Sequence, residues 1–476
     1  MQMIKFGTGG WRAIIGDDFT KANIQLLAKA LCSKMKAEGQ ADKGIVIGYD
    51  RRFLAKEAMQ WAGEVFAEEG VKAYLINKSS PTPLIMFYVM KHGFPYGMMV
   101  TASHNPAIYN GIKVFTAGGR DADESQTKDI EEYIRSTDGA SVKGMEYEKA
   151  LSLGLIEEIY PLNEYLDNII SAVNMDAIRK KGLRVVLDPL YGVSETSLAT
   201  ILHTARCELT VIHDRHDTLF GGKLPAPNAV TLRPLQNAVI DYKGDIGIAT
   251  DGDADRIGVI DDTGRFLHPN DILVLLYYYL VKYKGWEGPV VRNIATTHML
   301  DKVADKFGQK CYEVPVGFKH ISAKMNAVGA IIGGESSGGL TVRGHINGKD
   351  GIYAAALLVE MIAATGKKLS EIYKEIEEEC GSIFMEERDY KFNQEKKDKM
   401  HKTLMEEKKI PELPFEIEKV SYLDGSKVYF KNGGWVIGRF SGTEPLIRIF
   451  CEMPDIEMAK QVCDIYEEFL GLGKYA

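Results

Sequence analysis

The segment Asp-Gly-Asp-Ala-Asp-Arg carries three aspartates at alternate positions, Asp251, Asp253 and Asp255. Carboxylates this close repel one another unless a cation neutralises them, and oxygen ligands are those that Mg²⁺ prefers. An EF-hand loop requires glycine at its sixth position, where this segment has Arg256. A haloacid-dehalogenase-type phosphatase is another alternative. It would have Thr or Val at position 255 and would carry this motif in the first strand of its domain, and neither condition holds here. A solvated acidic turn is the simpler alternative, but the apolar runs on both sides favour a divalent metal.

A second candidate is Ser103 in the segment Thr-Ala-Ser-His-Asn-Pro. A serine on a turn directly after a buried strand is exposed and fixed, which suits a nucleophile. A serine hydrolase is the obvious alternative, but no G-x-S-x-G elbow surrounds this residue. A turn whose Ser, Asn and Pro only satisfy the backbone is the simplest interpretation of the loop taken alone.

Two glycine-containing loops offer binding groups. In Gly-Gly-Glu-Ser-Ser-Gly-Gly (333–339), Glu335 and Ser337 could bind vicinal sugar hydroxyls, although such loops are mostly simple turns. In Arg-Phe-Ser-Gly-Thr-Glu-Pro (439–445), followed by Arg448, hydroxyls and arginines form an anion cradle suited to phosphate. A capped turn with a solvated arginine is about equally favoured there. The N-terminal Phe-Gly-Thr-Gly-Gly-Trp-Arg is another glycine-rich turn, and Arg12 breaks the Rossmann pattern.

The elements that carry these loops follow a repeated rhythm of apolar run, turn and amphipathic stretch. Each of three α/β units has its most unusual loop after its third strand, which predicts a degenerate internal repeat. The expected strands are 45–48, 73–76 and 97–100, then 184–187, 209–212 and 246–249, then 289–292, 311–314 and 330–332. Residues 272–281 predict a buried helix, and the last hundred residues predict a smaller α+β domain.

Composition limits the class of protein. The 476 residues are 45% hydrophobic and 26% charged, with a net charge of −8, which argues against a generally basic protein that coats nucleic acid. Six cysteines without a CxxC pair predict neither a disulfide framework nor a zinc site. The N-terminus lacks an apolar signal region, and no apolar run is long enough for a membrane helix. We therefore expect a cytoplasmic protein that binds neither nucleic acid nor a membrane.

Taken together, the motifs resemble those of the α-D-phosphohexomutase superfamily, which includes phosphoglucomutases and phosphomannomutases. The resemblance covers the whole chain in the family's order: GTGGWR, TASHNP with Lys113, DGDADR, GGESSGG and RFSGTEP. It implies a four-domain, heart-shaped enzyme with three related α/β domains and a smaller α+β domain similar to the TATA-binding-protein fold. The expected domains are 1–158 with the phosphoserine loop, 159–263 with the metal loop, 264–380 with the sugar loop and 381–476 with the phosphate loop.

The resemblance also implies a role for each matching residue. Ser103 would carry and donate a phosphoryl group, and Asp251, Asp253 and Asp255 would hold Mg²⁺ with a phosphoserine oxygen. Lys113 would be the general acid/base, in a role that a lowered pKa would favour. Arg12, His104 and Arg256 would position the reacting phosphoryl group. The substrate side would comprise Glu335 and Ser337 for the hydroxyls, Lys319 and His320 for sugar discrimination, and Arg439, Ser441, Gly442, Thr443 and Arg448 for the non-reacting phosphate.

The implied activity is interconversion of hexose 1-phosphate and hexose 6-phosphate, with glucose 1,6-bisphosphate as activator and intermediate. Two departures from the family pattern stand out: Ala13 replaces a common glycine, and the sugar loop reads GESSGG, not the GEMSGH of phosphomannomutase-type members. The second favours a glucose phosphate. A phosphomannomutase or dual enzyme is the close alternative, and Ala254 disfavours a phosphoglucosamine mutase. A metal-dependent sugar phosphatase and a catalytically silent binding protein are more distant.

Overall fold

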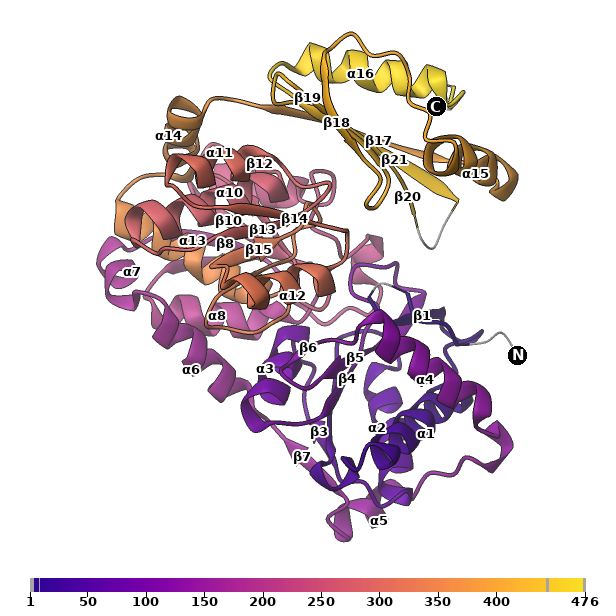
Figure 1. Cartoon of the computed structure of the whole chain (residues 1–476). Coiled ribbons are helices and arrows are strands. Elements are labelled where there is room, and N and C mark those ends of the chain that lie inside the picture. The colour runs from indigo at the N-terminus through magenta and orange to yellow at the C-terminus, as the bar shows by residue number, and fades with distance from the viewer. Residues whose placement is uncertain (1–3, 8, 442–444, 474–476) are drawn as a thin grey trace.

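The computed structural model describes residues 4–7, 9–441 and 445–473. Its strands form four sheets that follow one another along the chain, and each sheet carries its own helices (Figure 1). Within the described ranges, no helix is both long and apolar enough to cross a membrane.

The first sheet has seven strands in the order β1-β5-β4-β2-β3-β7, with β6 on β5. Helices α1, α2 and α4 cover one face, and α3 covers the other. Because both faces are covered, β2 and β4 are buried throughout and read as unbroken apolar runs. The strands are β1 Trp11–Ile14, β2 Ile45–Tyr49, β3 Ala73–Ile76, β4 Tyr96–Val100, β5 Tyr109–Thr116, β6 Arg120–Asp121 and β7 Ile156–Ile159. The helices are α1 Lys21–Ala37, α2 Ala55–Glu68, α3 Thr82–His92, α4 Glu124–Ser136 and α5 Tyr147–Ser152.

The second sheet has the order β12-β11-β10-β8-β9, and the third has the order β14-β13-β15-β16. Their strands are β8 Arg184–Asp188, β9 Glu208–Val211, β10 Ile246–Thr250, β11 Ile257–Ile260, β12 Phe266–Leu267, β13 Val290–Asn293, β14 Cys311–Val314, β15 Ile332–Gly334 and β16 Leu340–Val342. Their helices are α6 Leu162–Ala172, α7 Met175–Lys181, α8 Ser194–Thr204, α9 Arg233–Asp241, α10 Pro269–Tyr278, α11 Met299–Lys306, α12 Phe318–Val328, α13 Gly351–Thr365 and α14 Leu369–Cys380.

The predicted repeat is confirmed by the topology. Each of these three sheets contains the same four-strand path, β5-β4-β2-β3, β11-β10-β8-β9 and β16-β15-β13-β14. The first pair in each path is an antiparallel hairpin, and the remaining strands are parallel. The loops TASHNP, DGDADR and GESSG are the tips of these three hairpins.

The fourth sheet is antiparallel, in the order β17-β21-β20-β19-β18. Its elements are β17 Phe384–Lys391, α15 Gln394–His401, β18 Ile417–Ser421, β19 Ser426–Phe430, β20 Trp435–Phe440, β21 Leu446–Met453 and α16 Ile456–Phe469. Figure 1 shows α16 on the side of this sheet that faces away from the rest of the molecule. On the other side, Tyr429, Trp435 and Phe450 pack with Ile294 and Ala295 of the third unit.

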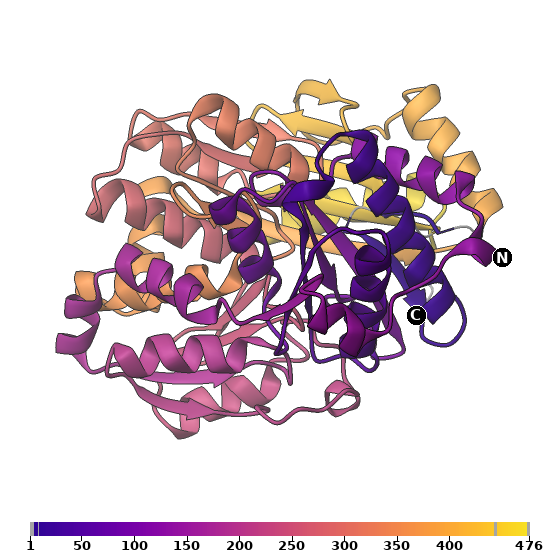
Figure 2. The ribbon, with the colours of Figure 1, turned by 90° about the horizontal axis from the view of Figure 1, so that it is seen from below.

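The helices α10 and α13 are buried on nearly all sides and join the second and third units, while α3 of the first unit packs on α6 of the second. The buried helix predicted over 272–281 is confirmed, because these residues lie in α10 and in the π-helical turn Tyr279–Tyr283 that continues it. Both views show the second and third units side by side, with the first unit next to them (Figures 1 and 2). The α/β architecture with a smaller α+β fourth unit is thus confirmed, while the exact domain limits stay a prediction.

Candidate active site

The tips of the first two hairpins meet at Ser103. This residue is buried, not exposed as predicted, because the tip of the second hairpin packs against it. It lies in the left-handed region at φ +53° and donates a hydrogen bond from Oγ to Asp251 Oδ2 over 2.7 Å. The two backbones approach so closely that a Cβ added at Gly252 would lie 2.8 Å from the Ser103 carbonyl oxygen. Glycine at position 252 therefore lets the metal loop reach the serine loop.

An arginine beneath the serine loop fixes its shape. The buried Arg52 guanidinium donates to the carbonyl oxygens of Ser103 and Asn105, over 2.7 and 2.6 Å, and to those of Pro106 and Tyr109, both over 2.9 Å. Asp50, directly after β2, accepts hydrogen bonds from the Arg52 backbone N–H and from Thr101 Oγ1. These bonds satisfy carbonyl groups that a buried loop would otherwise leave unpaired.

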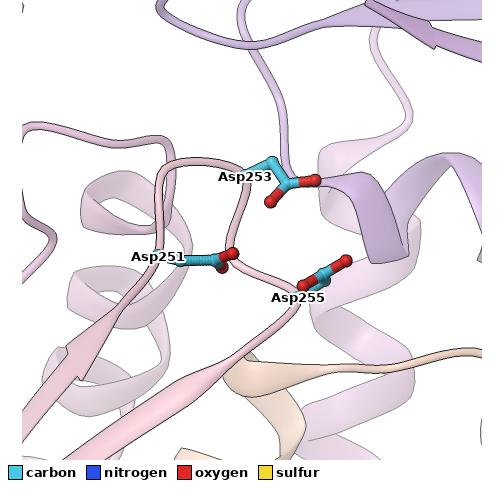
Figure 3. Close-up of side chains that lie close together, drawn as sticks. All are labelled: Asp251, Asp253 and Asp255. Atoms are coloured by element: carbon cyan, nitrogen blue, oxygen red, sulfur yellow. The ribbon is translucent and has the colours of Figure 1, made fainter. Parts of the chain in front are cut away.

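The aspartates of the second hairpin point toward one another in a buried cluster (Figure 3). One carboxylate oxygen from each of Asp251, Asp253 and Asp255 lies within 4.8 Å of the others. Lys113 Nζ donates to Asp253 Oδ2 and Asp255 Oδ2 over 2.7 and 2.6 Å, and Thr82 Oγ1 donates to Asp253 Oδ2 over 2.6 Å.

The residues present fit a divalent cation. Protein donors hold the Oδ2 atoms of Asp253 and Asp255, whereas their buried Oδ1 atoms accept no hydrogen bond from any described residue. Buried oxygens without a donor are costly, and a hard cation such as Mg²⁺ would satisfy both. The chain turns between the aspartates at Ala254, which has φ +61°. The aspartate triad could therefore hold a metal ion.

The pKa values of two aspartates in this cluster shift in opposite directions. Burial raises the pKa of Asp251 well above its usual value, and the charges of Asp253 and Asp255 raise it further. Burial acts in the same sense on Asp255, but the positive charges of Lys113 and Lys349 outweigh it and hold this pKa well below the usual value. For Lys113, burial is outweighed by Asp253 and Asp255, which raise its pKa. Lys113 is thus held as an ammonium group, the form that donates a proton.

Three further predicted residues surround the serine. His104 Nδ1 lies 3.3 Å from Ser103 Oγ, and Arg12 Nη1 donates to Asn105 Oδ1 over 2.6 Å. The Arg256 backbone N–H donates to Asp251 Oδ1 over 3.1 Å, and its side-chain Nε lies 3.9 Å from Asp255 Oδ1. The charge of Arg256, with burial and Arg12, lowers the pKa of His104 well below its usual value. His104 is therefore neutral near pH 7, beside two cationic groups.

The third hairpin brings the sugar loop together with residues 316–320. Glu335 Oε1 accepts hydrogen bonds from Gly317 N and Asn293 Nδ2 over 3.1 and 3.3 Å, and Ser337 Oγ donates to Glu335 Oε2 over 3.4 Å. In the neighbouring α12, Lys319 Nζ lies 3.8 Å from Glu124 Oε2, and burial lowers the pKa of His320. The second hairpin joins this group through a β-bridge between Arg256 and Gly339.

The fourth unit presents two arginines on neighbouring strands. Arg439 in β20 and Arg448 in β21 are cross-strand partners. Arg439 Nε donates to Asp424 Oδ2 over 3.0 Å, and the same oxygen accepts a hydrogen bond from Val316 N over 2.9 Å. Asp424 therefore connects the fourth unit to residues 316–320, which lie beside the sugar loop. Arg448 Nε lies 3.4 Å from Asp389 Oδ1.

Between these strands, Ser441 N donates to Leu446 O over 2.8 Å, and Lys397 Nζ donates to Ser441 O over 2.8 Å. The predicted phosphate ligands Gly442 and Thr443 lie outside the described residues. Contacts therefore link all four predicted loops, although the cradle is described only at its two ends.

Several residues of this site belong to none of the motifs predicted from the sequence. Asp50 and Arg52 directly follow a buried strand, as the predicted loops do, and that position is the signal that could have identified them. Thr82 and Lys349 lie outside any motif, and only the fold brings them to the aspartates. The N-terminal motif also differs from the glycine-rich turn that was predicted, because its end is a strand: Ala13 lies inside β1 and pairs with Asn110 of β5.

Comparisons with known proteins identify the family of the chain. Four family models match consecutive parts of the chain: phosphoglucomutase/phosphomannomutase alpha/beta/alpha domain I over residues 3–140, domain II over 163–264, domain III over 268–380, and the C-terminal domain over 394–468. The family predicted from the motifs is therefore confirmed.

Relatives align along almost the whole chain. A phosphoglucomutase/phosphomannomutase of Thermococcus kodakarensis is 29% identical and is aligned over 97% of both chains. A Methanobrevibacter smithii protein named as a probable phosphoglucosamine mutase is 31% identical over 96% of both chains. The crystal structure of parafusin, a phosphoglucomutase from Paramecium, shares the fold with a TM-score of 0.84 at 22% identity, covering 99% of this chain and 96% of that one. The chain therefore belongs to the phosphoglucomutase/phosphomannomutase family, a family of phosphotransferase isomerases.

Proposed function

We propose that this protein interconverts hexose 1-phosphate and hexose 6-phosphate through a phosphorylated Ser103. The observation that carries the proposal is the contact between Ser103 Oγ and Asp251 Oδ2 at a buried triad of aspartates. A serine held against potential metal ligands is suited to giving and receiving a phosphoryl group. A pure binding protein would have no use for that arrangement.

Two transfers make up the proposed reaction. Phospho-Ser103 gives its phosphoryl group to one hydroxyl of the bound hexose phosphate, which yields a hexose 1,6-bisphosphate and free Ser103. After the bisphosphate has turned over in the site, its other phosphoryl group passes to Ser103. Glucose 1,6-bisphosphate would therefore act as both intermediate and activator.

The surrounding residues have complementary proposed roles. Bound to Asp251, Asp253 and Asp255, Mg²⁺ would neutralise the charge of the transferring oxygens. Lys113 as an ammonium donates a proton in one transfer, and as the amine it accepts one in the reverse transfer. Arg12, Arg256 and the neutral His104 orient the phosphoryl group.

The substrate is gripped at both ends in this proposal. Glu335 and Ser337 bind sugar hydroxyls, with Lys319 and His320 beside them. The cradle of Arg439, Ser441, Gly442, Thr443 and Arg448 holds the phosphate that is not reacting. Because the bisphosphate turns over, the cradle must accept either phosphate, and paired arginines on a hairpin provide donors to both arrangements.

We propose glucose as the preferred sugar, because the sugar loop departs from the phosphomannomutase-type pattern at GESSGG. Mannose phosphate, alone or with glucose phosphate, is the close alternative within the same chemistry. Glucosamine phosphate is a second candidate, favoured by the 31% identity to the Methanobrevibacter smithii protein, although Ala254 argues against it.

The test is a mutase assay on purified protein with Mg²⁺ and trace glucose 1,6-bisphosphate. The 1-phosphates of glucose, mannose and glucosamine are compared for 6-phosphate product and for inorganic phosphate. Faster turnover of glucose 1-phosphate supports the proposal, and comparable rates with mannose indicate a dual enzyme. Release of inorganic phosphate without isomerisation would identify a phosphatase instead.

A further inference from the structure

A second lysine reaches the aspartate triad. Lys349 Nζ lies 3.0 Å from Asp255 Oδ2, the same oxygen to which Lys113 donates over 2.6 Å. One carboxylate oxygen thus carries two ammonium partners, while Asp255 Oδ1 accepts no hydrogen bond from a described residue. Asp255 is therefore the aspartate of the triad with the most cationic contacts.

The two lysines differ in how they are held. Lys113 lies in the middle of β5, its side chain is 5% exposed, and it is fixed between Asp253 and Asp255. Lys349 lies in the loop between β16 and α13, its side chain is 14% exposed, and Asp255 is the ion-pair partner that the structure gives it. Lys349 is thus more exposed than Lys113, and moving it to another partner would break one ion pair, whereas moving Lys113 would break two.

Gly339 of the sugar loop makes room for the Lys349 side chain. A Cβ added at Gly339 would lie 2.3 Å from Lys349 Cδ and 2.8 Å from its Cγ. The backbone φ at Gly339 is not positive, so alanine there would be excluded by this contact and not by the backbone. The sugar loop therefore determines the path by which this ammonium reaches the metal ligand.

The charge of Lys349 is also felt on the serine side of the site. Arg256 and burial are the main causes of the lowered pKa of His104, and Lys349 adds to them. His104 in turn lies 3.3 Å from Ser103 Oγ. Lys349 is therefore positioned between the sugar loop, the metal ligand and the reacting hydroxyl.

From these contacts, and resting on the proposed function, we propose that Lys349 is a tethered counter-ion that exchanges between Asp255 and the substrate. Without a divalent ion, its ammonium neutralises Asp255. A divalent ion bound at Asp255 Oδ1 would neutralise this carboxylate and weaken its ion pair with Lys349 at Oδ2, so that the ammonium could turn to the phosphoryl oxygens of the incoming sugar phosphate. Lys349 is then an internal competitor of the metal and a binding residue for the substrate anion.

The test compares Lys349→Met with the native protein in two titrations. Calorimetry with Mn²⁺ on unphosphorylated protein is expected to show about three- to tenfold tighter metal binding, because a competing positive charge has gone. Titration with glucose 6-phosphate at saturating Mg²⁺ is expected to show about tenfold weaker binding. Lys284→Met removes a comparable lysine that is paired with buried Glu360 away from the site, and both affinities should stay unchanged.

Opposite signs in the two titrations distinguish the proposal from simple damage to the site. Weaker or unchanged metal binding in Lys349→Met would overturn it. Metal binding can be measured without turnover. If the native protein isomerises no sugar but Lys349→Met still binds Mn²⁺ more tightly, the mutase activity is refuted while the competition between Lys349 and the metal stands.

A double-mutant cycle gives an independent measurement. Gly339→Ala should displace the lysine side chain and reproduce the tighter Mn²⁺ binding of Lys349→Met. In a Lys349→Ala background the clash is gone, so Gly339→Ala should leave the Mn²⁺ affinity unchanged. Equal effects of Gly339→Ala in both backgrounds would refute the proposed coupling.

Discussion

At the scale of single residues, the serine loop depends on a side chain that never touches substrate in the proposed reaction. Arg52 is fully buried and gives hydrogen bonds to four carbonyl groups between residues 103 and 109, and Asp50 lies 3.4 Å from it. The guanidinium fork suits this task because its donors are planar and fixed in direction. The left-handed backbone of Ser103 is thereby held in place.

Replacing Arg52 by Met should lower the free energy of unfolding by about 3–5 kcal/mol, since Asp50 and the loop carbonyls lose their buried partner. Urea unfolding followed by tryptophan fluorescence measures the change. Arg215→Met is the matched control, because its side chain is 74% exposed and lies 3.6 Å from Asp217, and a loss below about 1 kcal/mol is expected there. Equal losses in the two variants would contradict the assigned role.

At the scale of elements, the antiparallel hairpin is the device that places chemistry in this fold. The tips of three related hairpins carry Ser103, the aspartate triad and Glu335, and a fourth hairpin places Arg439 opposite Arg448. Neighbouring strands are about 5 Å apart, so the two guanidinium groups can address one phosphate group. Their present partners are the carboxylates of Asp424 and Asp389, which a phosphate group would replace.

Arg439→Met and Arg448→Met should each raise KM for the hexose phosphate about 10- to 100-fold, the cost of losing a charge-assisted hydrogen bond. The effect on kcat should be smaller, because the distant phosphate is bound in ground state and transition state alike. Steady-state kinetics separate the two constants. Lys431→Met, in the β19–β20 turn at the other end of the sheet, serves as the control. An unchanged KM with a fall in kcat would argue against a cradle role.

At the scale of the whole molecule, a buried ionic cluster joins the fourth unit to the third. Lys427 of β19 donates to Glu313 Oε2 and to the Ile294 carbonyl oxygen, over 2.7 and 2.6 Å, and Arg292 Nη1 donates to the same Glu313 oxygen over 2.6 Å. Trp435 stacks on the Lys427 ammonium at 4.1 Å. This cluster fixes the base of the unit that carries the proposed phosphate cradle.

The cluster predicts a pH dependence of stability. Burial, with a contribution from the charge of Arg292, lowers the pKa of Lys427 to about 7 from a usual value of 10.5. Between these pH values the unfolded chain binds the proton and the folded chain does not, so this residue makes stability rise with pH from about 7 to about 10. In Lys427→Met, melting temperatures measured by calorimetry should rise less over this range than in the native protein. Parallel pH profiles would contradict the assignment.

Much of this arrangement could be predicted from the sequence, because Ser103, Asp251 and Glu335 each follow a short apolar run that ends in an unusual loop. The direction of strand pairing could not be predicted, since it depends on contacts between residues that are far apart in the chain. Lys113 was grouped with the TASHNP motif, but its place in β5, between β4 and β1, depends on such contacts. Nor could the contact of Lys349 with Asp255 be predicted, because no local pattern joins the two residues.

The measurement that tests the central claim most directly is the location of the transferred phosphoryl group. Native protein is incubated with glucose 1,6-bisphosphate and Mg²⁺ and analysed by peptide mass spectrometry, before and after an excess of glucose 1-phosphate. We predict phosphate on Ser103 that passes to sugar without release of inorganic phosphate, and a Ser103→Ala variant with neither label nor turnover. Near-normal isomerisation by Ser103→Ala, or turnover with Ser103 unmodified throughout, would contradict it.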